Sequence, residues 1–132
     1  MVDSLHQRLS DAFNRGLKNG FESLGDIDKE LFLIQHFIVE FEMNGLSGYF
    51  YNRLPDVAAL ESAVVAMRKH GFAQLAELLA EAVAPFASYV DRTTPTTWGA
   101  VRDAYDPNRI LDSVSKRISN LRSYGVERET DL

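Results

Sequence analysis

The sequence contains no cysteine, and its eight glycines recur without a period. The absence of thiols excludes cysteine nucleophiles, cysteine-ligated zinc, iron–sulfur clusters and a disulfide scaffold. The lack of a glycine period excludes a collagen-like chain. A chain without cysteine fits a reducing compartment, and we expect a cytoplasmic protein.

Long hydrophobic runs are also missing. The most apolar stretch, residues 31–43, is interrupted by Gln35, His36, Glu40 and Glu42. It is too short to cross a bilayer, which takes about 20 apolar residues. The N-terminal residues lack the apolar core of a signal peptide. We therefore expect no membrane span.

The length and composition of the chain are those of one ordinary globular domain. The chain has 132 residues, of which 45% are hydrophobic and 25% charged, so we expect a single helical domain over residues 1–132 with a polar tail at 126–132. The 19 acidic residues outnumber the 14 basic ones, for a net charge of −5. Because nucleic-acid binders carry a basic surface, we expect no direct binding to nucleic acid.

Apolar residues recur at helical spacing along most of the chain. The first series predicts a helix that weakens near Gly16 and Gly20. A second helix over residues 30–43 has little polar face, which indicates a central helix surrounded by others, and Asn44-Gly45 is a common helix stop. The residues expected to face inward from the first helix are Leu5, Leu9, Ala12, Phe13 and Leu17.

Two further helices are expected to form an antiparallel hairpin about Gly71. The first begins at the cap residue Asp56 and ends near Lys69, with Leu60, Val64 and Met67 on one face. The second is broken or kinked at Pro85. A last helix opens at Asp106-Pro107 and ends by Gly125, with Ile110, Leu111, Val114, Ile118 and Leu121 inward. No strand alternation is evident, so the sequence predicts an all-α, compact single-domain bundle of about five to seven helices with a central buried helix.

Candidates for chemistry are few. His36 and Glu40 lie four residues apart, a spacing that suits two ligands or a base with an orienting carboxylate, although an ordinary intrahelical pair is commoner. Asn44 and Asn52 flank the following corner and either bond the turn or line a shallow cleft. The three histidines fall in different helices, and no phosphate-binding loop is present. We expect no catalysis, no metal and no cofactor.

Negative charge is concentrated in the middle of the chain. Residues 22–91 carry four basic and eleven acidic side chains, a net charge of −7, whereas each flanking segment has a net charge of +1. Asp26, Asp28 and Glu30 form one cluster, and Glu77 and Glu81 lie one helical turn apart, a rise of about 6 Å. Such clusters either form a solvated helix face or bind a partner.

The segment 44–52, Asn-Gly-Leu-Ser-Gly-Tyr-Phe-Tyr-Asn, combines turn residues with three consecutive aromatics. Packing at a corner is the first interpretation, and an exposed surface formed by Tyr49 and Tyr51, for a partner or a homodimer seam, is the alternative.

This segment resembles the Asn-Gly-rich, Tyr-Phe-x-Asn signature of a bacterial domain family of unknown function that includes a DNA-mimic protein. Residues 67–82 are similar to its second hallmark, a helix ending in Gly followed by Leu-Ala-x-Leu-Leu-x-x-Ala. The resemblance covers about residues 30–90. It departs from the signature where Leu46 follows Gly45 and where Gly48 stands in place of Gln.

The resemblance implies an all-helical bacterial protein without an assigned activity. We therefore expect a non-catalytic interaction protein that binds a DNA-binding protein through an acidic surface, as a DNA mimic. The contact candidates are Asp26, Asp28, Glu30, Glu77, Glu81, Tyr49 and Tyr51. The alternative is a small-ligand-binding or enzyme-like domain that uses the Asn44–Asn52 corner with His36 and Glu40.

Overall fold

The computed structural model describes residues 2–53, 57–92, 110–121 and 124. Every element within these ranges is a helix, which confirms the all-α class. The elements are α1 (Val2–Asn19), the 3₁₀ turn η1 (Phe21–Ser23), α2 (Asp26–Arg53), α3 (Val57–Lys69), α4 (Ala73–Arg92) and α6 (Ile110–Ser119). The expected signals at Asp56, Asp106-Pro107 and Gly125, and the tail 126–132, lie outside the described residues.

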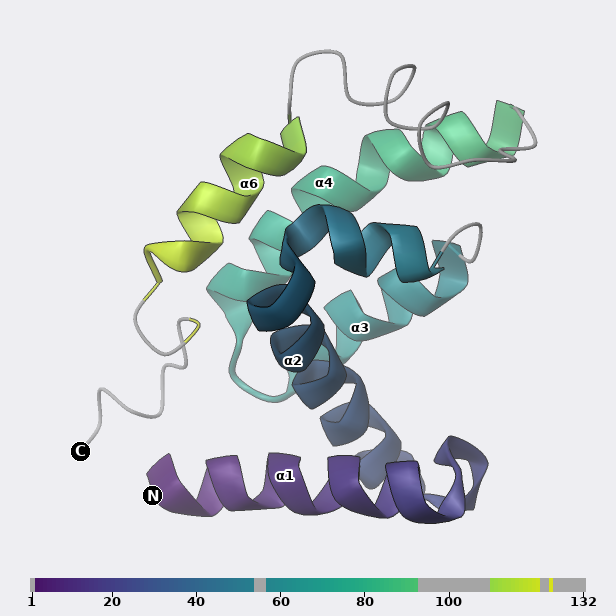
Figure 1. The fold of residues 1–132 in the computed structure, drawn as a ribbon, viewed down its shortest axis with the longest axis vertical. Helices are drawn as coiled ribbons and strands as arrows, with labels where there is room; N and C mark the ends of the chain where they lie inside the picture. Colours follow the sequence, from purple (N-terminus) through teal and green to yellow (C-terminus); the bar gives the residue numbers. More distant parts are fainter. Residues whose placement is uncertain (1, 54–56, 93–109, 122–123, 125–132) are drawn as a thin grey trace.

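Helix α2 is the centre of the bundle. It rises from the end of α1, which lies across one end of the molecule, and packs against α1, α3 and α6 (Figure 1). Leu31, Ile34 and Phe37 are fully buried along it. The predicted central helix is therefore confirmed. None of the described helices combines the length and the hydropathy that a membrane crossing requires.

A sharp break interrupts α2 at Gly45. Its φ of 72° and ψ of 179° fall in a region that only glycine occupies readily, and helical backbone resumes after it as far as Arg53. The predicted stop at Asn44-Gly45 is thus a change of direction between two helical segments. The two segments approach so closely that a Cβ built at Gly48 would overlap the Cβ of Asn44.

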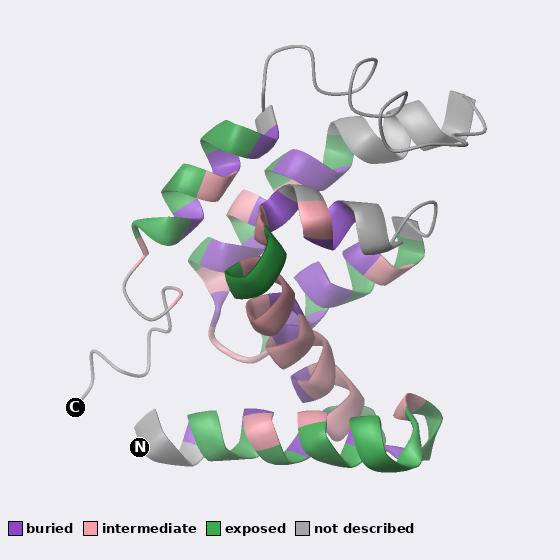
Figure 2. Cartoon of the chain, in the orientation of Figure 1, coloured by how far each residue is buried: buried purple, intermediate pink, exposed green. Residues whose placement is uncertain are grey.

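Helix α1 buries one narrow stripe against α2. Leu5, Leu9 and Ala12 are buried as predicted (Figure 2), but Leu17 is 65% exposed, so its inward placement was wrong. At about 100° per residue, the stripe continues to Gly16, and Leu17 points about 110° away from its centre. The absence of a side chain at Gly16 admits the ring of Phe32 from α2.

Helices α3 and α4 pack together across the turn at Gly71, whose φ is 90°. Leu60, Val64 and Met67 are buried, as predicted. Of the break or kink expected at Pro85, the break is absent, because helix α4 continues through Pro85 to Arg92. A proline removes one backbone hydrogen bond, and the preceding turns of α4 are anchored in the core by Leu75, Leu79, Ala82 and Val83.

Helix α6 closes the bundle over α4 and α2. Leu111, Val114 and Ile118 are buried, and Leu121 packs against the core just after the helix ends, which confirms the predicted inward face. The side chain of Ile110 lies outside the described part of the chain. The α6 helix therefore places its polar side, rather than its apolar one, toward solvent.

Candidate functional site

The three carboxylates of the first acidic cluster all lie on α2, and two of them contact cations of neighbouring helices. The carboxylate of Asp28 accepts a hydrogen bond from Arg15 of α1 at 2.5 Å. The carboxylate of Glu30 accepts one from Lys69 of α3 at 2.7 Å, and His70 Nε2 lies 2.9 Å from its other oxygen. Asp26 is exposed at the start of α2. Two of the three carboxylates therefore join helices to one another.

Glu30 is the most strongly engaged member of this cluster. The hydrogen bond from Lys69 lowers the pKa of its carboxyl, and the contact with His70 lowers it further, against the opposing effect of burial. Its side chain is 22% exposed. Glu30 thus carries a stable negative charge that is matched by positive charge from α3.

The second acidic cluster, Glu77 and Glu81 on α4, has one member that contacts a cation of a neighbouring helix. Arg117 of α6 donates a hydrogen bond to the carboxylate of Glu81 on α4, and both side chains remain nearly half exposed. Glu77, one turn before Glu81, is exposed. Glu81 is therefore paired with a cation of the neighbouring helix, whereas Glu77 has no such partner among the described residues.

The aromatic corner is largely core. Tyr49 is only 2% exposed, and its ring meets Phe37 edge-on with centroids 4.8 Å apart. Phe50 is fully buried. The break at Gly45 turns this segment back onto α2, so the expected surface contact through Tyr49 is wrong. The side chains of Tyr51 and Asn52 fall outside the described part.

His36 and Glu40 form an intrahelical pair, with Nε2 and Oε2 3.9 Å apart. The ring of His36 lies beside Phe13 and Phe32 in the seam between α1 and α2. Asn44, one turn beyond Glu40, is exposed. No group of three or more described histidine, aspartate or glutamate side chains is placed to hold a metal ion.

A contact that the sequence did not suggest joins Tyr124 to the central helix. The hydroxyl of Tyr124 donates a hydrogen bond to Glu42 of α2. Burial raises the pKa of Tyr124, and the hydrogen bond to Glu42 raises it further. Tyr124 has a φ of 61°, an uncommon value for a residue with a side chain. It lines a cleft of about 240 Å³ with His6, Ser10, Gln35 and three apolar residues.

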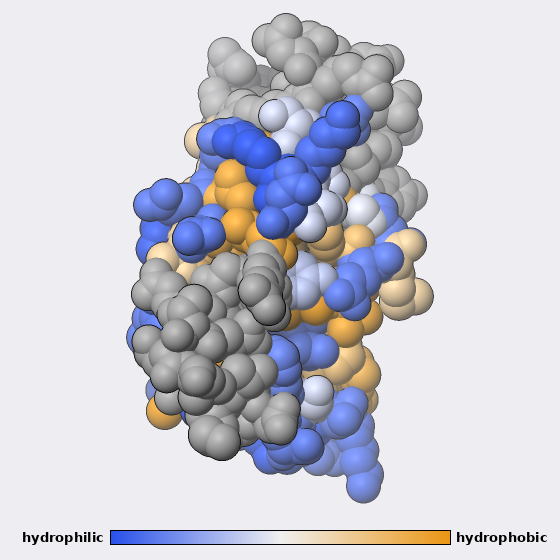
Figure 3. Space-filling model, turned by 90° about the vertical axis from the view of Figure 1, so that its left-hand side faces the viewer, coloured by the Kyte–Doolittle hydropathy of each residue, from blue (hydrophilic) through white to orange (hydrophobic). Residues whose placement is uncertain are grey.

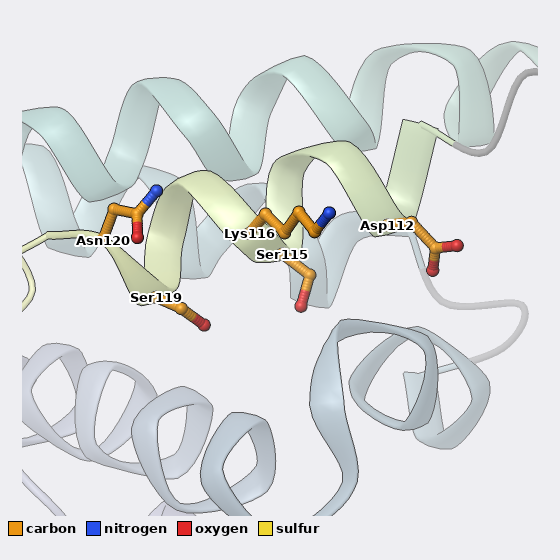
Figure 4. A pocket seen from close by; sticks show the side chains of 5 residues that line it. All are labelled: Asp112, Ser115, Lys116, Ser119 and Asn120. Carbon is orange, nitrogen blue, oxygen red and sulfur yellow. The ribbon is translucent and has the colours of Figure 1, made fainter.

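Two further clefts differ in character. The larger, of about 630 Å³, lies along the polar side of α6, where Ser115, Lys116, Ser119 and Asn120 project with Asp112 (Figure 4). The face of the molecule on this side is predominantly hydrophilic, with apolar surface visible between the polar side chains (Figure 3). The other cleft, of about 480 Å³, lies between η1, the start of α2 and one side of α3.

This last cleft was missed because its members are distant in sequence. Glu30 and Glu61 line it, together with the apolar side chains of Phe21, Leu33 and Val65. A local signal existed in α3, where Val65 lies one turn beyond the exposed polar residues Glu61 and Ser62. The 53% exposure of Val65, however, depends on how α2 packs against α3.

The carboxylates that remain without internal compensation are fewer than the sequence suggested. Asp26, Glu61 and Glu77 are exposed, and none has an ion-pair partner among the described residues. They project from α2, α3 and α4. These three are therefore the candidate contact residues, with Asp28, Glu30 and Glu81 available only in competition with their internal partners.

Comparison with known proteins adds one finding. The model of a protein family described as DMP19-like protein matches residues 22–131. The match is longer than the resemblance noted over residues 30–90, and it includes both the acidic segment and α6. No curated protein and no solved structure matches the chain.

Proposed function

Because the chain belongs to the DMP19-like protein family, we propose that it is a non-catalytic protein-binding domain that occupies the basic surface of a DNA-binding protein as a mimic of DNA. The observation that carries this proposal is the family match over residues 22–131. The matched segment contains the whole of the acidic region, residues 22–91.

The distribution of charge supports the proposal. A basic DNA-binding groove attracts any surface that presents negative charge in place of phosphates. Asp26, Glu61 and Glu77 provide exposed carboxylates on three helices. Since the helices are fixed by a common core, the spacing of these groups is set before the partner arrives, which reduces the entropy lost on binding.

The internal ion pairs fit the same function. An exposed ion pair contributes about 0–1 kcal/mol, so a partner with several Arg or Lys side chains can replace one internal cation with its own. Glu81, whose pair with Arg117 is nearly half exposed, is the best suited to such exchange. Glu30 is less suited, because two side chains hold it.

Affinity capture followed by elution with DNA tests the proposal. The immobilised domain is incubated with a bacterial lysate at low salt, washed, and challenged with duplex DNA. We expect the DNA to release one or a few DNA-binding proteins. The variant Asp26→Asn/Glu61→Gln/Glu77→Gln should retain at least tenfold less of them, whereas Asp11→Asn, on the exposed side of α1, should retain as much as the wild type.

Two results would contradict the proposal. One is the capture of no protein that duplex DNA releases. The other is equal retention by the wild type and the three-site variant, because the binding would then not depend on the exposed carboxylates. High salt should weaken the specific capture, since screening acts on exposed charges.

A further inference from the structure

The cleft between α2 and α3 is lined by apolar side chains and by four polar ones, Lys29, Glu30, Glu61 and Ser62. It has a volume of about 480 Å³. Leu33 and Ala66 form part of its floor, and Val65 is 53% exposed at its side. Small side chains at Ala58 and Ser62 leave room along this side of α3. A volume of this size accommodates two or three aliphatic side chains of a bound segment.

The charged side chains of the cleft differ in whether they have an ion-pair partner. Lys29 lies over the ring of Phe21, 5.5 Å from its centroid, with its ammonium 3.4 Å from Glu22. Glu30 is held by Lys69 and His70. Glu61 is the exception, because it is exposed and has no ion-pair partner within the described residues. The cleft thus presents one uncompensated carboxylate beside exposed apolar surface.

From this combination we infer that the α2–α3 cleft binds an amphipathic basic helix, which inserts aliphatic side chains beside Val65 and places a Lys or Arg against Glu61. A helix that fits a groove presents apolar residues at i, i+3 or i+4, and i+7, and its flanking positions meet the rim. The phosphates that this chain would mimic do not bind aliphatic side chains, so this contact is additional to phosphate mimicry. The inference rests on the proposed function only in that the partner is a protein.

Fluorescence anisotropy with a synthetic peptide tests this inference on the full chain. The probe is a labelled helical peptide in which Leu recurs at i, i+3 or i+4, and i+7, flanked by Lys. Its control is a peptide of the same composition in scrambled order. We expect saturable binding of the first peptide and at least tenfold weaker binding of the second.

Three surface variants locate the binding. Glu61→Lys removes the acidic contact, and Ser62→Trp fills the cleft without a change of charge; each should weaken binding about tenfold. Asp11→Lys makes the same charge change on α1, outside the cleft, and should alter the affinity less than about threefold. Circular dichroism of each variant checks the helical fold, and because all three positions are exposed we expect it to be retained.

Specific outcomes would overturn the inference. They are the absence of saturable binding, equal binding of the scrambled peptide, an equal effect of Asp11→Lys and Glu61→Lys, or no effect of Ser62→Trp. Any of these results, together with the capture of a protein that duplex DNA releases, would rule out the cleft as a helix-binding site. The proposed function would then still hold. Peptide binding without DNA-releasable capture would overturn the proposed function alone.

Discussion

Lys69 at the end of α3 donates a hydrogen bond to Glu30 on α2 at 2.7 Å. The two residues are 39 positions apart in the sequence. Glu30 was expected to face a partner, but it instead holds two helices together. His70 contacts the same carboxylate from the following position.

The Glu30 contact makes stability depend on pH. The pKa of Glu30 is lowered in the folded state from an ordinary value of 4.5. Its contribution is therefore fully present above that ordinary value and is lost as the pH falls through the lower folded value. Glu30→Gln should lower the free energy of unfolding by about 0.5–1 kcal/mol at about pH 7. Urea denaturation at about pH 7 and at a pH well below 4.5 should show this difference decreasing at the lower pH.

The control for this prediction is Glu77→Gln, on an exposed carboxylate without a described ion pair. It should leave the free energy of unfolding nearly unchanged. A Glu30→Gln effect that is equally large at both pH values would show that packing, rather than the charge of Glu30, is responsible.

The contact of α1 with α2 depends on Gly16. A Cβ at this position would overlap the ring of Phe32, so Gly16→Ala should destabilise the domain by about 1–3 kcal/mol through overpacking. Gly25→Ala is the matched control, because a Cβ there meets nothing within 4 Å. Thermal unfolding should separate the two variants clearly, and equal melting temperatures would contradict the close packing of α1.

Gly45 tests a different kind of requirement. A Cβ would have open space at this position, but the backbone has a φ of 72° and a ψ of 179°. Gly45→Ala should therefore cost about 1–3 kcal/mol through backbone strain alone. Chemical denaturation against Gly25→Ala measures that cost, and a stability equal to that of the control would mean that α2 is not broken here.

The pair formed by Glu81 and Arg117 should be weak. Their side chains are 46% and 45% exposed, and exposed ion pairs measure about 0.2–1 kcal/mol in double-mutant cycles. A cycle built from Glu81→Gln and Arg117→Gln should give a coupling energy below about 1 kcal/mol that decreases with added salt. A coupling well above this value would argue against the exchange of Arg117 for a partner's cation.

The helical fold could be predicted because the apolar spacing is local. Leu60, Val64 and Met67 are buried as their spacing indicates, and the break at Asn44-Gly45 follows from residues adjacent in sequence. The prediction for Leu17 was wrong because either Gly16 or Leu17 could end the buried face of α1. Gly16 is the buried one, since the ring of Phe32 packs against it. No local pattern contains that information.

The candidate site was less predictable, for the same reason. Tyr49 lies in an aromatic run that suits either a surface or a core, and its burial follows from the direction that the chain takes after Gly45. Glu61 has no acidic residue within four positions of it, so no local cluster marks it in the sequence. It lies one helical turn before Val65 on α3, but it lines one cleft with Glu30 only when α2 and α3 pack together.

The most direct test of the central claim is whether a captured DNA-binding protein can hold this chain and its own DNA at the same time. Labelled duplex DNA bound to that protein is titrated with the chain, and the species are separated by size. The account predicts that DNA is displaced as the chain binds, and that Asp26→Asn/Glu61→Gln/Glu77→Gln displaces at least tenfold less effectively. A stable ternary complex of DNA, partner and chain would contradict it.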